Sequence, residues 1–196
     1  MFMSNLKFGW AEIDLTPDKK VSLAGQFAER ISEYVEKPIT ATAMAVSSEE
    51  DQMVLVSCDL LAVGWKLVVA VRERLKSNNV GLAPEKIVMS AIHTHTGPSY
   101  ASATEGRLGN TGTSFRSILE PHLPKGKKYV EKANISDNPE IIGQVEMFDL
   151  LVERLSKVVL EAWENRSAGC FTNAFGRAAV GMCRRAVYSD GSAQMW

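Results

Sequence analysis

The chain lacks several features that would each place it in a definite class of protein. None of its 196 residues belong to a run of about 18 apolar residues, so we expect no membrane span. Its N-terminus has no charged stretch followed by a long apolar one, which argues against a signal peptide. The cysteines are few and none are spaced as CxxC: Cys58, Cys170 and Cys183. These absences together favour a reduced, cytoplasmic protein.

An excess of basic charge is also missing. The 22 lysines and arginines are balanced by 23 aspartates and glutamates, giving a formal net charge of −1, so nucleic acid is not an expected partner. Apolar residues make up 45% and charged residues 23% of the chain, the proportions of an ordinary globular domain. A chain of this length can bury a core, so we treat residues 1–196 as a single domain.

Apolar periodicity predicts an α/β fold, with a mixed or parallel β-sheet and flanking helices. An apolar stripe at helical spacing predicts a helix over residues 65–77, between two continuous apolar runs. Such runs are typical of strands buried on both faces, and a strand, a helix and a strand in this order form a parallel βαβ unit. We expect strands over residues 6–13, 39–47, 53–58 and 87–92.

The second half of the chain predicts fewer elements. A long helix is expected over residues 139–165, followed by a strand over 169–180 and by two strands around a turn at 189–191. Cys58 and Cys170 lie in apolar runs and are expected in the core. Asp14, just before Thr16 and Pro17, is expected to fix a turn through an Asx-type hydrogen bond.

Residues 94–138 are rich in glycine and proline and have little periodicity. A connection of this length inside a compact domain is usually functional or mobile. This one begins at a pair of histidines, His93 and His95, that follow a predicted strand. We therefore predict a long active-site loop over residues 94–138.

The two histidines are spaced as HxH at the end of a strand. Residues two apart in a strand point to the same side, so both imidazoles face one way if the chain stays extended through His95. Sites gather beyond the carboxyl ends of parallel strands, and Gly97 and Pro98 bend the chain away there. Imidazole is a common zinc ligand, so the pattern favours a metal or catalytic site. The alternative is a pair of histidines that cap the strand through hydrogen bonds.

The sequence around the histidines resembles that of a known family. Residues 88–98, VMSAIHTHTGP, resemble the histidine motif of the neutral/alkaline (non-lysosomal) ceramidase family. Residues 8–17 look like that family's opening strand and D-I-T-P turn, and residues 54–60 look like its V-S-x-D strand. Residues 181–185 look like its N-R segment, with Cys183 where an asparagine often stands. The resemblance covers nearly the whole chain and is strongest at the histidine motif.

The resemblance implies an activity and a set of roles. Family members hydrolyse the amide bond of ceramide to sphingosine and a fatty acid, with one Zn²⁺ held by two histidines, a glutamate and a tyrosine. His93 matches the first zinc histidine, and His95 matches the histidine that contacts the reacting carbonyl or its oxyanion. Arg184, or its neighbour Arg185, matches the arginine that helps bind the substrate oxygens. Asp59 is a candidate for orienting a histidine from behind, or for a turn or helix cap.

The family's remaining zinc ligands and its serine lie further along than Trp196. A catalytic zinc site needs about three protein ligands, and His122 is not expected to be one of them. The resemblance therefore implies the front portion of a larger layered α/β catalytic domain, namely the N-terminal part of a zinc-dependent amide hydrolase acting on a lipid or small-molecule N-acyl amide. We expect this chain alone to be poorly active and to self-associate through unpaired strand edges.

Two other functions stay open on the sequence. One is a non-catalytic binding or interaction domain that keeps the fold without the rest of the site. The other is a hydrolase that uses His93 or His95 as a general base without a metal. Metal analysis of the purified protein separates the zinc enzyme from both.

Overall fold

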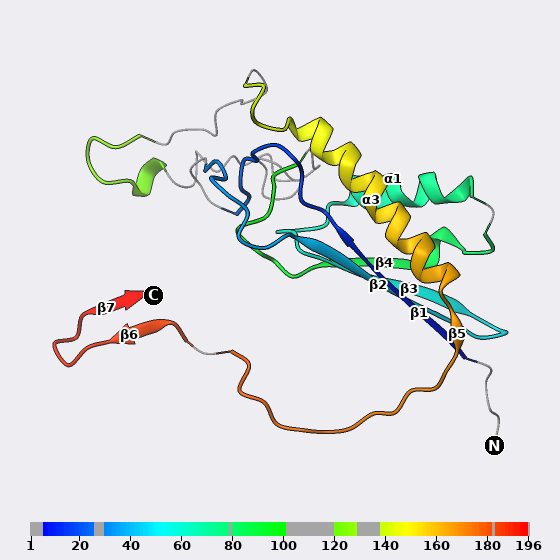
Figure 1. Cartoon of the computed structure of the whole chain (residues 1–196). Helices are drawn as coiled ribbons and strands as arrows, with labels where there is room; N and C mark the ends of the chain where they lie inside the picture. The colour runs from blue at the N-terminus through cyan, green and yellow to red at the C-terminus, as the bar shows by residue number, and fades with distance from the viewer. Residues whose placement is uncertain are drawn as a thin grey trace.

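The structure is a computed structural model that describes residues 6–25, 30–78, 80–100, 120–128, 138–181 and 183–195 (Figure 1). Within these residues, five strands form one sheet in the order β4-β3-β2-β1-β5. Strands β3 and β4 are parallel and the other neighbouring pairs are antiparallel, so the sheet is mixed, as expected. The strands are β1 (Lys7–Asp14), β2 (Thr40–Ser47), β3 (Gln52–Cys58), β4 (Ile87–Ala91) and β5 (Ser167–Ala168).

The predicted βαβ unit is confirmed. Helix α1 (Trp65–Lys76) follows β3, and a short 3-10 turn, η1 (Pro84–Lys86), leads into β4. The buried residues of α1 are Leu67, Val71 and Leu75, which recur every four residues and so line one side of the helix. The parallel β3–β4 pair places the carboxyl ends of both strands at one edge of the sheet.

Helix α3 (Gln144–Glu164) packs beside α1 and against β1 and β2. It begins at Gln144 rather than at Pro139, because the backbone before it bonds elsewhere. Lys20 donates its N–H to Glu140 O, and Ile142 donates its N–H to Lys20 O. These bonds bridge two distant segments and compete with the first helical turn. The last element before the helix in the described ranges is the turn η3 (Glu120–His122).

The core lies between the sheet and the two helices. Ala41, Ala43 and Ala45 alternate along β2 and have no exposed surface, so α3 can approach that strand closely. At Gly9 a Cβ would overlap the carbonyl oxygen of Ala162, which makes this glycine a requirement of the packing. No helix in the described part of the chain is long and apolar enough to cross a membrane.

The other face of the sheet is open, which corrects the prediction that residues 53–58 and 87–92 are buried on both faces. Met53 is 38% exposed and Val88 is 50% exposed, and Trp10 on β1 is 56% exposed. In Figure 1 α1 and α3 lie on the same side of the strands. A shallow groove of about 290 Å³ on the open face is lined by uncharged side chains. A short apolar run is compatible with a half-buried strand as well as with a fully buried one, so the pattern alone could not separate the two.

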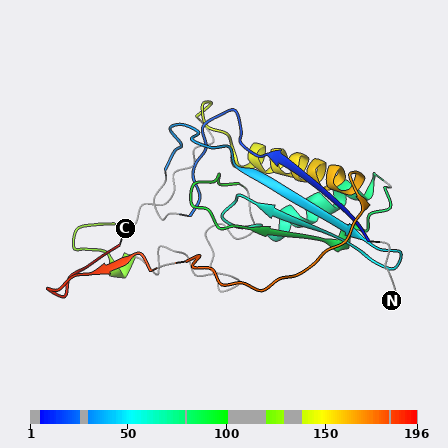
Figure 2. The same ribbon diagram turned by 60° about the horizontal axis from the view of Figure 1, so that its bottom comes forward.

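The predicted strand over residues 169–180 is also wrong. After β5, residues 169–181 are exposed and have no regular structure, and Figure 2 shows them as a stretch of chain that passes below the strands toward the other end of the sheet. Gly169 donates to Leu6 O just outside the start of β1, so β1 offers no further partner along this direction. Cys170 is exposed rather than buried. The predicted final pair of strands is confirmed as an antiparallel hairpin of β6 (Arg185–Val187) and β7 (Ala193–Met195).

Candidate functional site

The histidine pair lies directly after β4, but the chain there is not extended. Ile92 donates its N–H to Cys58 O, and His93 donates its N–H to Leu60 O at 3.1 Å. His93 has φ +65°, the left-handed conformation. A non-glycine residue in such a region costs about 1–3 kcal/mol, and strained residues of this kind cluster at functional sites. The premise that extended geometry places both imidazoles on one side is therefore wrong.

The two rings nevertheless meet. Their centroids are 5.1 Å apart and their planes are inclined at 76°, an edge-to-face arrangement. Both side chains are exposed, beyond the carboxyl ends of the parallel strands β3 and β4. The turn at His93, rather than the alternation of a strand, brings His93 and His95 together.

One hydrogen bond determines which ring nitrogen of His93 carries the proton and which keeps its lone pair. Nδ1 lies 2.8 Å from the carbonyl oxygen of Leu61. A carbonyl can only accept, so Nδ1 must carry the proton, and Nε2 of the neutral ring keeps its lone pair. Metal-binding histidines usually have this arrangement, with the second ring nitrogen donating to a carbonyl or carboxylate. His93 is thus prepared to bind an electrophile through Nε2.

Two residues that the sequence pattern does not indicate, Gly25 and Arg30, contact His95. A Cβ placed on Gly25 would lie 2.8 Å from Cγ and Nδ1 of His95, so the glycine lets the backbone approach the ring. Arg30 donates from Nη2 to the main-chain oxygen of His95 at 2.6 Å. Ala24 N donates to Gly97 O, which joins the two segments. No periodic signal in the sequence marks Gly25 or Arg30.

Asp59 ties two strands together. Its Oδ2 accepts from the N–H of Thr40 at 2.9 Å and from the Thr40 hydroxyl at 3.3 Å. In the described part of the chain, no hydrogen bond joins Asp59 to His93 or His95. A role in orienting a histidine therefore stays a prediction, and the observed bonds hold the end of β3 to the start of β2.

Asp14 forms the predicted turn. The N–H of Thr16 donates to Asp14 Oδ1 at 2.6 Å. Burial raises the pKa of Asp14, but the hydrogen bonds from Thr16 and the charge of Arg154 outweigh it, so the pKa is lowered. Arg154 also donates to the main-chain oxygens of both residues of the turn. The turn is structural.

The other sequence candidates are not brought to the histidines. Arg184 is exposed just before β6, and Arg185 begins β6; within the described ranges neither bonds to His93 or His95. His122 is exposed in η3. Most of the predicted active-site loop, residues 101–119 and 129–137, lies outside the described residues. The role of Arg184 and the loop therefore stay predictions.

Whether the described residues fit a zinc ion depends on the donor atoms that they offer. His93 offers a free Nε2, and His95 lies beside it. Among the residues that the structure describes, no group of three or more His, Cys, Asp or Glu side chains could hold a metal. A catalytic zinc site needs about three protein ligands, so the described residues fit part of such a site and do not complete it.

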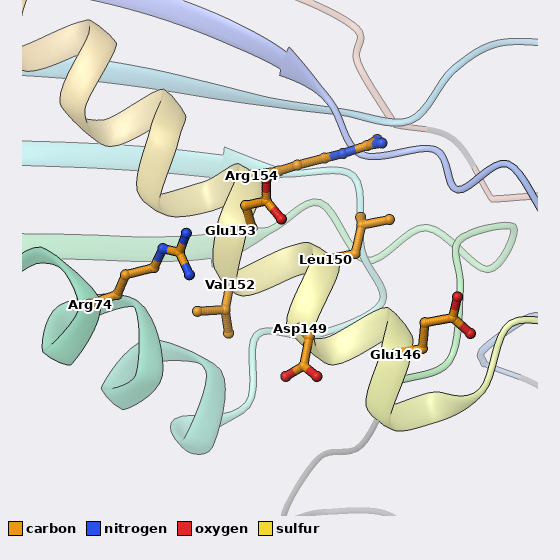
Figure 3. Close-up of a pocket in the computed structure, with 7 residues that line it drawn as sticks. All are labelled: Arg74, Glu146, Asp149, Leu150, Val152, Glu153 and Arg154. Atoms are coloured by element: carbon orange, nitrogen blue, oxygen red, sulfur yellow. The ribbon is translucent and has the colours of Figure 1, made fainter.

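A charged pocket lies away from the two histidines. It has a volume of about 460 Å³ and is lined by side chains of α1 and α3, among them Arg74, Glu146 and Glu153 (Figure 3). Lys19 pairs with Glu146 there at 2.9 Å. Neither histidine lines it, so this charged pocket is separate from the candidate site.

Comparison with solved structures supports the resemblance at the level of the fold. Neutral ceramidase from Pseudomonas aeruginosa superimposes with a TM-score of 0.60 and 18% sequence identity, over 86% of this chain and 23% of that chain. A ceramidase solved in complex with C2 superimposes with a TM-score of 0.58 and 19% identity, over 85% of this chain and 22% of that one. No protein-family model and no curated protein matches the chain. The chain thus has a ceramidase-like fold and spans less than a quarter of those two proteins.

Proposed function

We propose that this chain is the front portion of the catalytic domain of a zinc-dependent amide hydrolase that cleaves an N-acyl amide, such as N-acylsphingosine, into an amine and a fatty acid. The hydrogen bond from His93 Nδ1 to Leu61 O carries the proposal, because it leaves Nε2 free beside the second imidazole. The fold shared with two solved ceramidases supports the same activity. Fold alone does not fix a substrate, so the amide class rests on the site and the resemblance together.

Each residue has a distinct role in the proposal. His93 binds the metal through Nε2, and a bound Zn²⁺ would lower the pKa of its water to about 7 and polarise the amide carbonyl. His95 contacts the reacting carbonyl oxygen or its oxyanion, a stabilisation worth about 2.7–4 kcal/mol for one donor in other enzymes. Arg184 binds substrate oxygens. The remaining metal ligands come from outside the described residues.

A hydrolysis assay with metal control tests the proposal. The protein is incubated with Zn²⁺ and a fluorescent short-chain N-acylsphingosine, with and without a chelator. We expect weak hydrolysis that the chelator and His93→Ala both abolish, while His122→Ala, which changes an exposed histidine in η3, has no effect.

Two outcomes favour the other functions. Chelator-insensitive hydrolysis that still needs His93 or His95 would support a metal-independent hydrolase. Binding of the substrate without hydrolysis and without retained zinc would support a non-catalytic binding domain. Both results contradict the zinc enzyme.

A further inference from the structure

The connection from β3 to α1, residues 59–64, accepts three hydrogen bonds from the histidine turn, two from His93 and one from Thr94. The main-chain oxygen of Leu60 accepts from the N–H of His93 at 3.1 Å and from the N–H of Thr94 at 3.3 Å. The next carbonyl, that of Leu61, accepts from His93 Nδ1 at 2.8 Å. The position of this loop therefore determines both the left-handed backbone of His93 and the nitrogen that carries its proton.

Tyr100 in turn holds the loop. Its hydroxyl donates to Ala62 O at 2.8 Å and accepts from the N–H of Gly64 at 3.0 Å. The Tyr100 side chain is only 6% exposed, and its ring lies 6.3 Å from that of Phe148 on α3. Gly64 is the residue that caps the N-terminus of α1. One buried hydroxyl thus bonds to the loop on both sides of Val63 and anchors it to the helix layer.

We propose that Tyr100 is a positioning residue for His93. It keeps the Leu61 carbonyl on Nδ1, which fixes the Nδ1–H tautomer and leaves Nε2 unprotonated. The tautomer is a property of the metal-free chain, and only its use in binding zinc rests on the proposed function.

The chemistry of the loop explains why the hydroxyl is needed. Without it, the buried N–H of Gly64 and the carbonyl of Ala62 lose their partner, and a buried unsatisfied group favours rearrangement toward water. Leu61 is the neighbour of Ala62, so its carbonyl moves with the loop. An imidazole that has lost its fixed acceptor can then adopt either tautomer.

The substitution Tyr100→Phe tests the proposal, with Tyr34→Phe as the control. Both remove one phenolic hydroxyl, but Tyr34 is 75% exposed. Two-bond ¹H–¹⁵N correlation spectra of metal-free protein at about pH 8, above the ordinary imidazole pKa of about 6.5, report the tautomer of each histidine. Titration with Zn²⁺ alone gives the affinity.

We expect His93 to be in the Nδ1–H form in the wild type and in Tyr34→Phe, and to be a mixture of tautomers in Tyr100→Phe. Zinc affinity should fall about 10- to 100-fold in Tyr100→Phe only. This is the loss typical when a hydrogen-bond partner that orients a metal ligand is removed. An Nε2–H form of His93 in the wild type, or an unchanged tautomer in Tyr100→Phe, overturns the inference.

Two further readings keep the test decisive. If Tyr100→Phe does not fold, the wild-type protein is sufficient: the Gly64 amide must exchange slowly and His93 must be Nδ1–H, and failure of either overturns the inference. If the tautomer responds as expected but Zn²⁺ does not bind the wild type, the proposed function fails and the positioning role stands. If Zn²⁺ binds the wild type but the His93 tautomer is unchanged in Tyr100→Phe, the positioning role fails and the proposed function stands.

Discussion

Replacing Gly25 by alanine should damage the candidate site through a single methyl group. Gly25 has φ +87°, and the added Cβ would lie 2.8 Å from two ring atoms of His95 and 3.1 Å from Cδ1 of Leu61. Neither distance is tolerated without movement of the side chains. Because both neighbours belong to the histidine site, the strain falls on the geometry that the proposed function requires.

The magnitude follows from two costs and one gain. A left-handed conformation costs an alanine about 1–2 kcal/mol, and overpacking costs about 1–3 kcal/mol. Alanine also restricts the unfolded chain, which returns about 0.4–1 kcal/mol. We therefore expect Gly25→Ala to lower the free energy of unfolding by about 1–4.5 kcal/mol.

Gly81→Ala is the matched control. Gly81 has φ +75°, but a Cβ there would meet no atom of the described residues within 4 Å. It shares the conformational cost and lacks the clash, so its loss should be about 1.5 kcal/mol or less. Denaturant unfolding measures both, and histidine ring resonances show whether His95 moves. Equal losses in the two variants, or unchanged His95 resonances in Gly25→Ala, would refute the reasoning.

Three further predictions concern the fold. Gly9→Ala should destabilise the protein by about 3 kcal/mol or more, because its Cβ overlaps Ala162 O. Gly143→Ala, whose Cβ meets no described atom within 4 Å, should cost less than about 1 kcal/mol in the same denaturant assay. Burial and then the charge of Asp59 raise the pKa of Cys58 to about 12, so a thiol reagent at pH 8 should titrate only the two exposed cysteines until the protein is unfolded. The lowered pKa of Asp14 stabilises the fold above about pH 4, so the stability lost in Asp14→Asn should shrink as pH falls below that value. Three results would contradict these predictions: equal losses of stability in Gly9→Ala and Gly143→Ala, a third reactive thiol in the folded protein, or an effect of Asp14→Asn on stability that does not depend on pH.

The elements that the sequence predicted are those with a local cause. The stripe of α1, the apolar runs of β3 and β4, and the bond from Thr16 to Asp14 each depend on residues close together in the chain. Those features need no knowledge of the rest of the fold. The βαβ unit and the histidine pair at its end could therefore be located from the sequence.

The features that were missed depend on distant partners. The exposure of Trp10 and Val88 reflects which side the helices cover, and the run of residues 169–181 has no strand to pair with. The turn at His93 exists because Leu60 accepts two hydrogen bonds from it. The periodicity of the local sequence reveals none of these long-range contacts. The approach of Gly25 to His95 is likewise invisible in it.

The central claim is that His93 binds zinc through Nε2 at an amide hydrolase site. Titration of the protein with Zn²⁺, followed by the ¹⁵N resonances of its histidines, tests it most directly. We predict that Zn²⁺ shifts Nε2 of His93 and that His93→Ala abolishes binding, whereas His122→Ala leaves it unchanged. Zinc that leaves the His93 resonances unmoved, or that binds equally well to His93→Ala, would contradict the account.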